Sequence, residues 1–357
     1  MEWKVLSRPL ALMLFSGVAI WTATAVPSPA SVATRDVSGV YSVACPSKDV
    51  CFAGATLKTR SSMDRAAVFT TRNGGASWSL LATVSIGPQV LVCPTTQDCI
   101  GGAFSDRVVV TTDGGRRWTT HLVSSSLAEV QAISCPAAGD CWLSAITSRD
   151  DVFVYHSTNL GASWSKEKTP ALMVPMGSPS GIACVTRTEC IITGIGVLRT
   201  TNGGRKWTRY SRPSPGFLGQ LTCPSAHDCL AIRDVSSAVP SIASGAVYST
   251  SNMGATWKLR LSPRQVMSLN GLSCLSASRC VSVGYGYTAK GKSYTYWGAV
   301  ERTSDGGTSW VQERESKLPA LIGVSCIRRT SHCLAVGGSD VYSSTNDGKT
   351  WTAEPLL

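Results

Sequence analysis

Carboxylates are the side chains of this chain with the clearest potential for chemistry, and two of them occur in similar settings. Asp113 lies in TTDGGRRW and Asp305 lies in RTSDGGTSW. A loop aspartate can act as a general acid, a general base or a metal ligand. The same type of segment occurs five more times with asparagine at this position, and an amide cannot exchange protons in acid–base catalysis. We therefore predict that Asp113 and Asp305 are structural.

The seven segments share a hydroxyl residue, an Asp or Asn, a glycine and a tryptophan, and we call them the Gly-Trp turns. An Asp or Asn side chain bonds backbone groups two residues ahead, and glycine accepts a positive φ. Tryptophan carries a large apolar surface inward while its N–H finds a partner. Each segment is therefore expected to lock a hairpin. The paired positions are Asn73 and Trp78, Asp113 and Trp118, Asn159 and Trp164, Asn202 and Trp207, Asn252 and Trp257, Asp305 and Trp310, and Asn346 and Trp351.

Acidic residues outside the repeated positions are the other candidates for catalysis. A glycosidase needs two carboxyl groups about 5 to 9.5 Å apart. No sequence spacing pairs the remaining acids, which are Asp64, Asp106, Asp150, Asp151, Asp234, Glu301 and Asp340. A glycoside hydrolase is therefore kept as an alternative for which the sequence offers no catalytic residue.

Fourteen cysteines form seven local pairs. Zinc sites usually use C-x2-C spacing or paired histidines, whereas six of these pairs are C-x5-C and the last is C-x6-C. An even count at regular spacing in an exported chain predicts disulfides, each within its own repeat. The pairs are Cys45/Cys51, Cys93/Cys99, Cys135/Cys141, Cys184/Cys190, Cys223/Cys229, Cys274/Cys280 and Cys326/Cys333.

A cysteine pair and a Gly-Trp turn alternate in fixed order through seven units of about 40 to 50 residues, the signature of a repeat architecture. Each unit holds four short apolar or alternating runs, such as QVLVCP, CIGGAF, RVVVTT and RWTTHLV in the second unit. We predict an all-β fold: a single seven-bladed β-propeller with four antiparallel strands and one disulfide per blade. The cysteines of a pair would face each other across the turn between the first and second strands. The Gly-Trp turn would join the third and fourth.

The first 25 residues are typical of a signal peptide. Lys4 and Arg8 form a positive region ahead of the apolar run PLALMLFSGVAIW, and the small residues at Ala23 to Ala25 suit a cleavage site. An uncleaved anchor is the alternative, but the run is shorter than the roughly 20 residues of a membrane span. We assign 1–25 to the signal peptide, 26–37 to a short linker and 38–357 to the propeller. We expect a secreted protein, with retention at the cell surface left open.

The Gly-Trp turns, written S/T-x-D/N-x-G-x-S/T-W, resemble the Asp box or BNR repeat. Thr303, Asp305 and Trp310 illustrate the match, and Arg117 and Lys206 depart from it before the tryptophan. The chain is thus similar to sialidase-like and photosystem II assembly-factor-like propellers. Sialidases typically have six blades, an arginine triad and a Tyr/Glu nucleophile pair, and no matching motif follows the signal peptide. The seven units look more like the single-propeller assembly factors, and this resemblance implies a binding platform.

Irregular segments on the face opposite the repeated turns are expected to mark function. Units one, five and six have the longest segments between second and third strands, and unit six carries GYGYTAKGKSYTYWGAVE. Aromatic and basic residues there can stack sugars or anchor a protein; alternatively, the tyrosines pack on one another across a long hairpin. The candidate ligand-binding residues are Tyr285, Tyr287, Lys290, Lys292, Tyr294, Tyr296, Trp297, Arg60, Arg65 and Arg233.

A formal net charge of +11 favours anionic partners, although charge on outer strands also prevents edge-to-edge pairing. A glycan, an anionic surface polymer, a protein partner and a membrane surface all remain open. Export and the lack of a recognisable nucleic-acid motif argue against nucleic acid. We expect a monomer without cofactor or metal, acting as a non-catalytic binding scaffold.

Overall fold

The computed structural model describes residues 37–59, 64–174, 180–211, 213, 217–234, 245–263, 265–290, 293–315 and 317–356. The predicted signal peptide, most of the predicted linker, Arg60 and Lys292 lie outside these ranges. Strands and turns make up the described residues. No helix in these ranges has the length and apolar character needed to cross a membrane.

Seven sheets follow one another along the chain, and each contains four consecutive antiparallel strands. Blades 1 to 3 comprise β1 Val37–Ala44, β2 Cys51–Leu57, β3 Arg65–Thr71, β4 Ser79–Thr83; β5 Val90–Val92, β6 Cys99–Gly102, β7 Arg107–Thr111, β8 Thr119–Leu122; and β9 Glu129–Ala137, β10 Asp140–Ile146, β11 Val152–Ser157, β12 Ser165–Lys166. Blades 4 and 5 comprise β13 Ile182–Cys184, β14 Cys190–Gly194, β15 Gly196–Thr200, β16 Thr208–Tyr210; and β17 Phe217–Thr222, β18 Cys229–Asp234, β19 Ala246–Thr250, β20 Lys258–Leu261. Blades 6 and 7 comprise β21 Val266–Cys274, β22 Cys280–Lys290, β23 Ser293–Thr303, β24 Val311–Glu315; and β25 Gly323–Cys326, β26 Cys333–Gly337, β27 Asp340–Ser344, β28 Thr352–Glu354.

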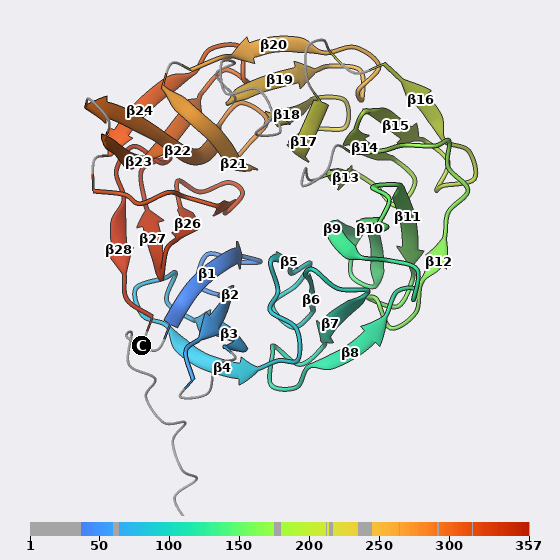
Figure 1. The fold of residues 1–357 in the computed structure, drawn as a ribbon, viewed down its shortest axis with the longest axis horizontal. Helices are drawn as coiled ribbons and strands as arrows, with labels where there is room; N and C mark the ends of the chain where they lie inside the picture. The colour runs from blue at the N-terminus through green and yellow to red at the C-terminus, as the bar shows by residue number, and fades with distance from the viewer. Residues whose placement is uncertain are drawn as a thin grey trace, which may run out of the picture. The chain divides into compact units, whose positions relative to one another are not determined.

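Burial changes from strand to strand within a blade. Second strands such as β14 and β26 are buried along their whole length, whereas outer strands such as β12 and β20 are largely exposed. Figure 1 shows the reason: the sheets stand around a ring with their fourth strands outermost, so neighbouring blades cover both faces of the middle strands. Strands covered on both faces are expected to be apolar throughout rather than alternating.

The hydrophobic core is divided among the seven gaps between blades. Each of the seven core clusters takes its residues from two adjacent blades. The cluster that contains Val40 and Leu334 joins blade 1 to blade 7. There the Val40 backbone N–H donates to the Gly338 carbonyl over 2.9 Å. The predicted seven-bladed propeller is confirmed, and the ring closes without exchange of a strand between its first and last blades.

One disulfide lies at the hairpin between the first and second strands of every blade, as predicted. The cysteine Cα atoms are 4.0–4.1 Å apart in all seven bridges. The described chain has no free cysteine. Seven bridges indicate an oxidising compartment.

The bridged cysteines face each other across the first two strands, as expected, and blade 3 adds an irregularity just beyond its bridge. Bridged cysteines of blades 4, 6 and 7 are direct cross-strand partners, as Cys184 and Cys190 are. In blade 3 the β9–β10 hairpin continues past the bridge to its last pair, Ala137 and Asp140, and the register shifts after Asp140. The register of the pairs Trp142/Ser134 and Leu143/Ile133 leads to Cys141 opposite Cys135, whose Cα atoms are 4.1 Å apart as in the other bridges. The expected facing arrangement therefore holds in blade 3 as well.

The bridges belong to the protein core rather than to a ligand surface. In each pair the cysteine on the second strand is at most 1% exposed, because neighbouring blades cover this strand on both faces. These buried residues are Cys51, Cys99, Cys141, Cys190, Cys229, Cys280 and Cys333, and on the first strands or just after them Cys223, Cys274 and Cys326 are buried as well.

Non-reducing peptide mapping of the purified protein is expected to recover seven local bridges, each within one blade. The reason is that each cysteine pair lies across a tight hairpin, so its partner is the nearest sulfur. A free thiol, or a bridge that joins two blades, would show that the connectivity is wrong.

Candidate ligand-binding surface

The topology gives the ring two different faces. The turn face carries the disulfide hairpins and the Gly-Trp turns, such as 45–50 and 72–78 in blade 1. The loop face carries the connections between second and third strands and between blades. Both repeated motifs lie on the turn face, so variation between blades is concentrated on the loop face.

The Gly-Trp turns are closed by one hydrogen-bond pattern. In blade 6, Thr303 Oγ1 donates to Asp305 Oδ1 over 2.8 Å and accepts from Gly307 N over 2.9 Å. Asp305 Oδ1 also accepts from Ser309 N over 2.9 Å. The other six turns repeat these three bonds with Asp or Asn at the central position. The side chain therefore serves as an acceptor in every turn.

Asp305→Asn is expected to change the free energy of unfolding by less than about 0.5 kcal/mol. In the unmutated protein Ser309 Oγ donates to Asp305 Oδ2 over 2.5 Å. In the asparagine turns the equivalent hydroxyl accepts instead, as Ser163 does from Asn159, so rotation of one hydroxyl restores the bond. Thr303→Val leaves the buried Gly307 N–H without its acceptor and should cost roughly 1–3 kcal/mol. Urea denaturation of both variants tests the pair; a larger loss for Asp305→Asn would contradict a structural role.

The tryptophans of the Gly-Trp turns pack into the gaps between blades, one in each core cluster. The expected N–H partner exists in two turns, where Trp310 and Trp351 donate to Gly307 O and Gly348 O over 3.1 Å. Four other indole N–H groups are buried without a partner among the described residues, which corrects the expectation for Trp78, Trp118, Trp164 and Trp257, whereas the Trp207 indole lies beside the Glu167 carboxyl group. Apolar burial is thus the common role of these side chains.

Blade 6 departs most from the other blades on the loop face. Its second and third strands, β22 and β23, have 11 residues each and pair without interruption from Cys280/Thr303 to Lys290/Ser293. The first strand, β21, pairs only as far as Gly286, and β24 only as far as Gly298. The β22–β23 hairpin therefore extends beyond its own sheet.

Four tyrosines lie on one face of the β22–β23 hairpin, and we call them the tyrosine face: Tyr285, Tyr287, Tyr294 and Tyr296. The ring centroids of Tyr285 and Tyr296 are 6.1 Å apart, and those of Tyr287 and Tyr294 are 5.4 Å apart, both in edge-to-face geometry. Cross-strand packing is thus present. Yet Tyr294 and Tyr296 remain 59% and 58% exposed, so packing orders the rings without covering them.

The tyrosine face is directed toward the blade 7 side of the hairpin. Alternate residues of a strand share one face, and Val281 and Val283, on the same face of β22 as Tyr285, pack in the core cluster shared with blade 7. On the loop face, blade 7 connects β26 to β27 through Gly338 and Ser339 alone. A connection this short is consistent with the exposure of the tyrosine rings.

The remaining candidate residues lie in different settings. Trp297 is half-buried and packs in the cluster between blades 5 and 6. Arg233 is only 7% exposed because it shares a face of β18 with Ala231, which packs toward blade 4. Arg65 is exposed at the start of β3, on blade 1. We therefore keep Arg233 and Trp297 out of the surface that the tyrosines form; for Lys290 only the backbone is described.

Exposed apolar side chains are otherwise scattered, and in the described ranges none lies within a Gly-Trp turn. Phe104 is 68% exposed in the β6–β7 connection, and Met173 is 47% exposed before β13. Both belong to the loop face but to other blades. The tyrosine face is the place where several exposed aromatic rings adjoin.

The non-periodic acids include one deeply buried carboxyl. Glu301, on β23, is fully buried on the face that packs toward blade 5, and neither carboxyl oxygen has a hydrogen-bond partner among the described residues. Burial raises the pKa of Glu301 to about 8, an effect that the nearby Gln312 side chain opposes and the Glu313 charge reinforces. Because it is fully buried, Glu301 is inaccessible to a substrate. A second acid, Glu129, also has its pKa raised by burial, to about 7.

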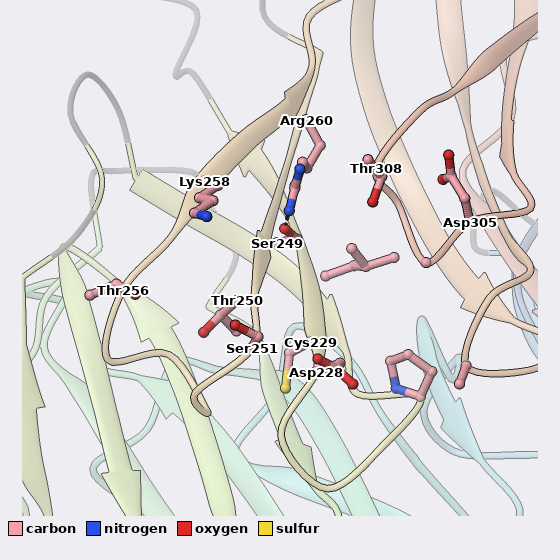
Figure 2. Close-up of a pocket in the computed structure, with 14 residues that line it drawn as sticks. Asp228, Cys229, Ser249, Thr250, Ser251, Thr256, Lys258, Arg260, Asp305 and Thr308 are labelled. Atoms are coloured by element: carbon pink, nitrogen blue, oxygen red, sulfur yellow. Dashed lines mark hydrogen bonds between the residues drawn. The ribbon is translucent and has the colours of Figure 1, made fainter.

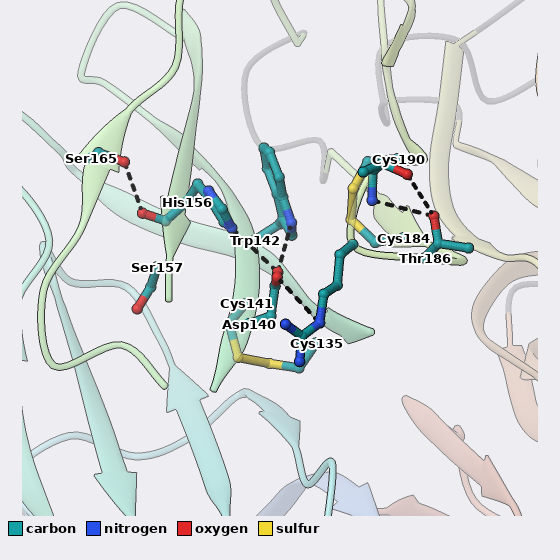
Figure 3. A network of polar contacts seen from close by, with 12 residues as sticks. Cys135, Asp140, Cys141, Trp142, His156, Ser157, Ser165, Cys184, Thr186 and Cys190 are labelled. Atoms are coloured by element: carbon teal, nitrogen blue, oxygen red, sulfur yellow. Dashed lines mark hydrogen bonds and ion pairs between the residues drawn. A yellow bond between two sulfur atoms is a disulfide. The ribbon is translucent and has the colours of Figure 1, made fainter. Parts of the chain in front are cut away.

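A cluster that sequence reasoning missed joins blades 3 and 4 on the turn face (Figure 3). Asp140 Oδ1 accepts from Trp142 Nε1 over 3.1 Å and lies 3.2 Å from His156 Nε2. Its other oxygen is 3.9 Å from Arg187 Nε of blade 4. The His156 ring stacks on Trp142 with centroids 3.9 Å apart. Because Trp142 is fully buried, we assign the cluster a structural role.

Comparison with known proteins shows the fold. No family model matches the chain, and no curated protein matches its sequence. Among solved structures, YCF48 bound to D1 peptide is similar with a TM-score of 0.61 and 14% identity, covering 90% of this chain and 96% of that chain. The WD40 propeller domain of Doa1 has a TM-score of 0.57 at 9% identity, covering 86% and 92%. A GH74 xyloglucanase from Xanthomonas campestris has a TM-score of 0.53 at 12% identity, covering 88% and 72%.

Proposed function

We propose that this protein is an exported, non-catalytic propeller that binds a protein partner through the tyrosine face of blade 6. The observation that carries the proposal is the exposure of Tyr294 and Tyr296 at 59% and 58% on a hairpin whose pairing fixes the rings. Tyrosine is enriched at binding hot spots because it offers a large amphipathic surface with few rotatable bonds. An ordered ring loses little conformational entropy when a partner covers it.

Three further observations support the proposal. Seven disulfides together with the signal-like N-terminus favour export. The hydrogen-bonded Gly-Trp turns favour kinship with Asp-box propellers that serve as platforms. One structural neighbour holds a bound peptide, so this kind of propeller can present a peptide-binding surface. The four tyrosines that define the tyrosine face carry no formal charge among the described side chains, which favours an apolar or aromatic peptide segment over an anionic polymer.

The glycoside hydrolase alternative ranks second. Its support is a fold shared with a xyloglucanase, and fold alone does not carry an activity. Of the non-periodic acids, Glu301 is buried between blades, and Asp64 accepts a hydrogen bond from Ser38 over 2.6 Å. No observation on the described residues favours a pair of catalytic carboxylates over the binding surface.

Peptide selection tests the proposal and needs no identified partner. Peptides selected from a random display library on the immobilised wild-type protein are expected to be rich in apolar residues. They should lose binding to a Tyr287→Ala/Tyr294→Ala double variant, because truncation removes two adjoining rings. A glycan array run in parallel tests the carbohydrate alternative. Selected peptides that bind both proteins equally, or strong glycan binding with no peptide enriched, would overturn the proposal.

A further inference from the structure

A pocket of about 300 Å³ opens on the turn face between blades 5 and 6 (Figure 2). Cys229 and Leu230 of β18 and Ser249 of β19 contribute to its lining, and Lys258 and Arg260 of β20 form the blade 5 wall. Asp305, Gly306 and Thr308 of the blade 6 Gly-Trp turn form the opposite wall. The pocket is separate from the tyrosine face, which lies on the other face of the ring.

The side chain three places after the tryptophan is used differently in different blades. In blades 1 and 3 the residue three places after the tryptophan packs against the Gly-Trp turn of the next blade. Leu81 approaches Gly115, and Glu167 approaches Gly204. In blade 5 this residue is Arg260, and its Nε turns back to donate to Ser249 Oγ over 2.7 Å. Arg260 is thus held against its own blade, and Leu230 rather than Arg260 approaches Gly307 of the blade 6 turn.

The unsatisfied groups of this pocket are mainly donors. Within the described chain, Lys258 Nζ and both terminal nitrogens of Arg260 have no hydrogen-bond or ion-pair partner, and neither do the hydroxyls of Ser251 and Thr308. Two cations beside free hydroxyls favour a ligand that carries a carboxylate. The Arg260 fork, held by its Nε, is already oriented for such a group.

The two carboxylates in the lining limit which anion fits. Asp228 Oδ2 accepts from Ser225 Oγ over 2.6 Å, and Asp305 accepts from its own turn, whose hydrogen bonds lower its pKa to about 2. Both side chains present acceptor oxygens to the pocket. A compact polyanion would be repelled by them, whereas ligand hydroxyls can donate to their remaining lone pairs. The matching ligand therefore combines one carboxylate with several hydroxyls.

We propose that this pocket binds a uronate, a sugar whose carboxylate pairs with Lys258 and Arg260 while its hydroxyls donate to Asp228 and Asp305. The volume lies at the lower end of the range for ligand pockets, which suits a single sugar unit. Apolar atoms of Leu230 and Ala277, which also line the pocket, can contact the C–H face of the ring.

Saturation-transfer NMR and calorimetry measure the binding of D-glucuronate to the purified full chain and so test this site. D-Glucose serves as the neutral analogue and glycine as a zwitterion without hydroxyls. We expect saturable binding of glucuronate, and tenfold or more weaker binding of glucose, since loss of a charge-assisted pair is worth at least tenfold, or about 1.4 kcal/mol. A tri-uronate that binds tighter than the monomer would identify a polymer as the source, and equal binding would identify the free sugar.

Lys258→Gln and Arg260→Gln are each expected to weaken glucuronate binding at least tenfold. Lys258 is exposed and lacks a partner among the described residues, so its replacement leaves the fold unchanged and keeps the test informative. Arg205→Gln, an exposed cation in the blade 4 Gly-Trp turn, is the matched control and should bind as wild type does. Absence of saturable binding, equal binding of glucose, tighter binding of glycine, or an equal loss in the control would overturn the proposal.

Discussion

Glu301→Gln is expected to raise the free energy of unfolding at pH 8 by roughly 3 to 5 kcal/mol and to leave it nearly unchanged at pH 4. Burial raises the pKa of Glu301 from 4.5 to about 8. The folded protein therefore keeps a proton on Glu301 that the unfolded chain releases above pH 4.5. The stability of the wild type should fall as the pH rises from 4.5 to 8, and glutamine has no such proton to lose.

Urea denaturation at several pH values, followed by tryptophan fluorescence, measures this slope. Asp305→Asn in the same blade is the control. The pKa of Asp305 is about 2, which lies below the range from pH 4.5 to 8, so removal of this carboxyl group should leave the pH dependence of stability in that range unchanged. Glu301→Gln should retain a smaller slope from Glu129, whose pKa burial raises to about 7. Parallel stability curves for wild type and Glu301→Gln would show that Glu301 is ionised in the folded state.

The blade architecture could be predicted because its signals are local. A cysteine pair and a Gly-Trp turn each report one hairpin, and their fixed order identifies both hairpins of a blade. Counting the units then predicts seven blades. Because each unit holds all four of its strands, the ring is expected to close without a strand shared between the first and last blades. Hydrogen bonds such as Gly307 N to Thr303 Oγ1 join residues four apart, so no long-range information is needed to anticipate them.

The settings of single side chains could not be predicted in the same way, since they depend on strand register and on the neighbouring blade. Arg233 and Trp297 look like surface residues in the sequence, but strand alternation turns them toward adjoining blades. Arg209 resembles a free outer cation, yet its guanidinium donates to Ala171 O over 2.7 Å and Ile195 O over 3.0 Å.

The inserts of blades 1 and 5 show a different limit. Part of the blade 1 segment, including Arg60, and most of the blade 5 segment lie outside the described residues, so their share in a ligand surface stays a prediction. Blade 6 gives a definite result: what looks like a long loop in the sequence forms two paired strands, and residues 291–292 lie outside the described ranges. The predicted mutual packing of its tyrosines is present, and the exposure of Tyr294 and Tyr296 leaves ligand contact as a prediction.

Truncation of a tyrosine on this hairpin is expected to have the second large effect. Tyr294→Ala should weaken binding of a selected peptide by roughly 2 kcal/mol or more, close to thirtyfold. The variant removes an exposed ring together with its edge-to-face contact to Tyr287. Tyr294→Phe keeps both and should bind within a few-fold of wild type. Because the side chain is 59% exposed, neither change should perturb the core.

The dissociation constant of the selected peptide for wild type, Tyr294→Ala and Leu259→Ala tests the central claim most directly. Leu259 is 52% exposed on the outer strand β20, away from the loop face, and serves as a control for loss of exposed apolar surface. The tyrosine face predicts a loss of about thirtyfold for Tyr294→Ala and wild-type affinity for Leu259→Ala. An unchanged constant for Tyr294→Ala, or an equal loss in both variants, would contradict binding at blade 6.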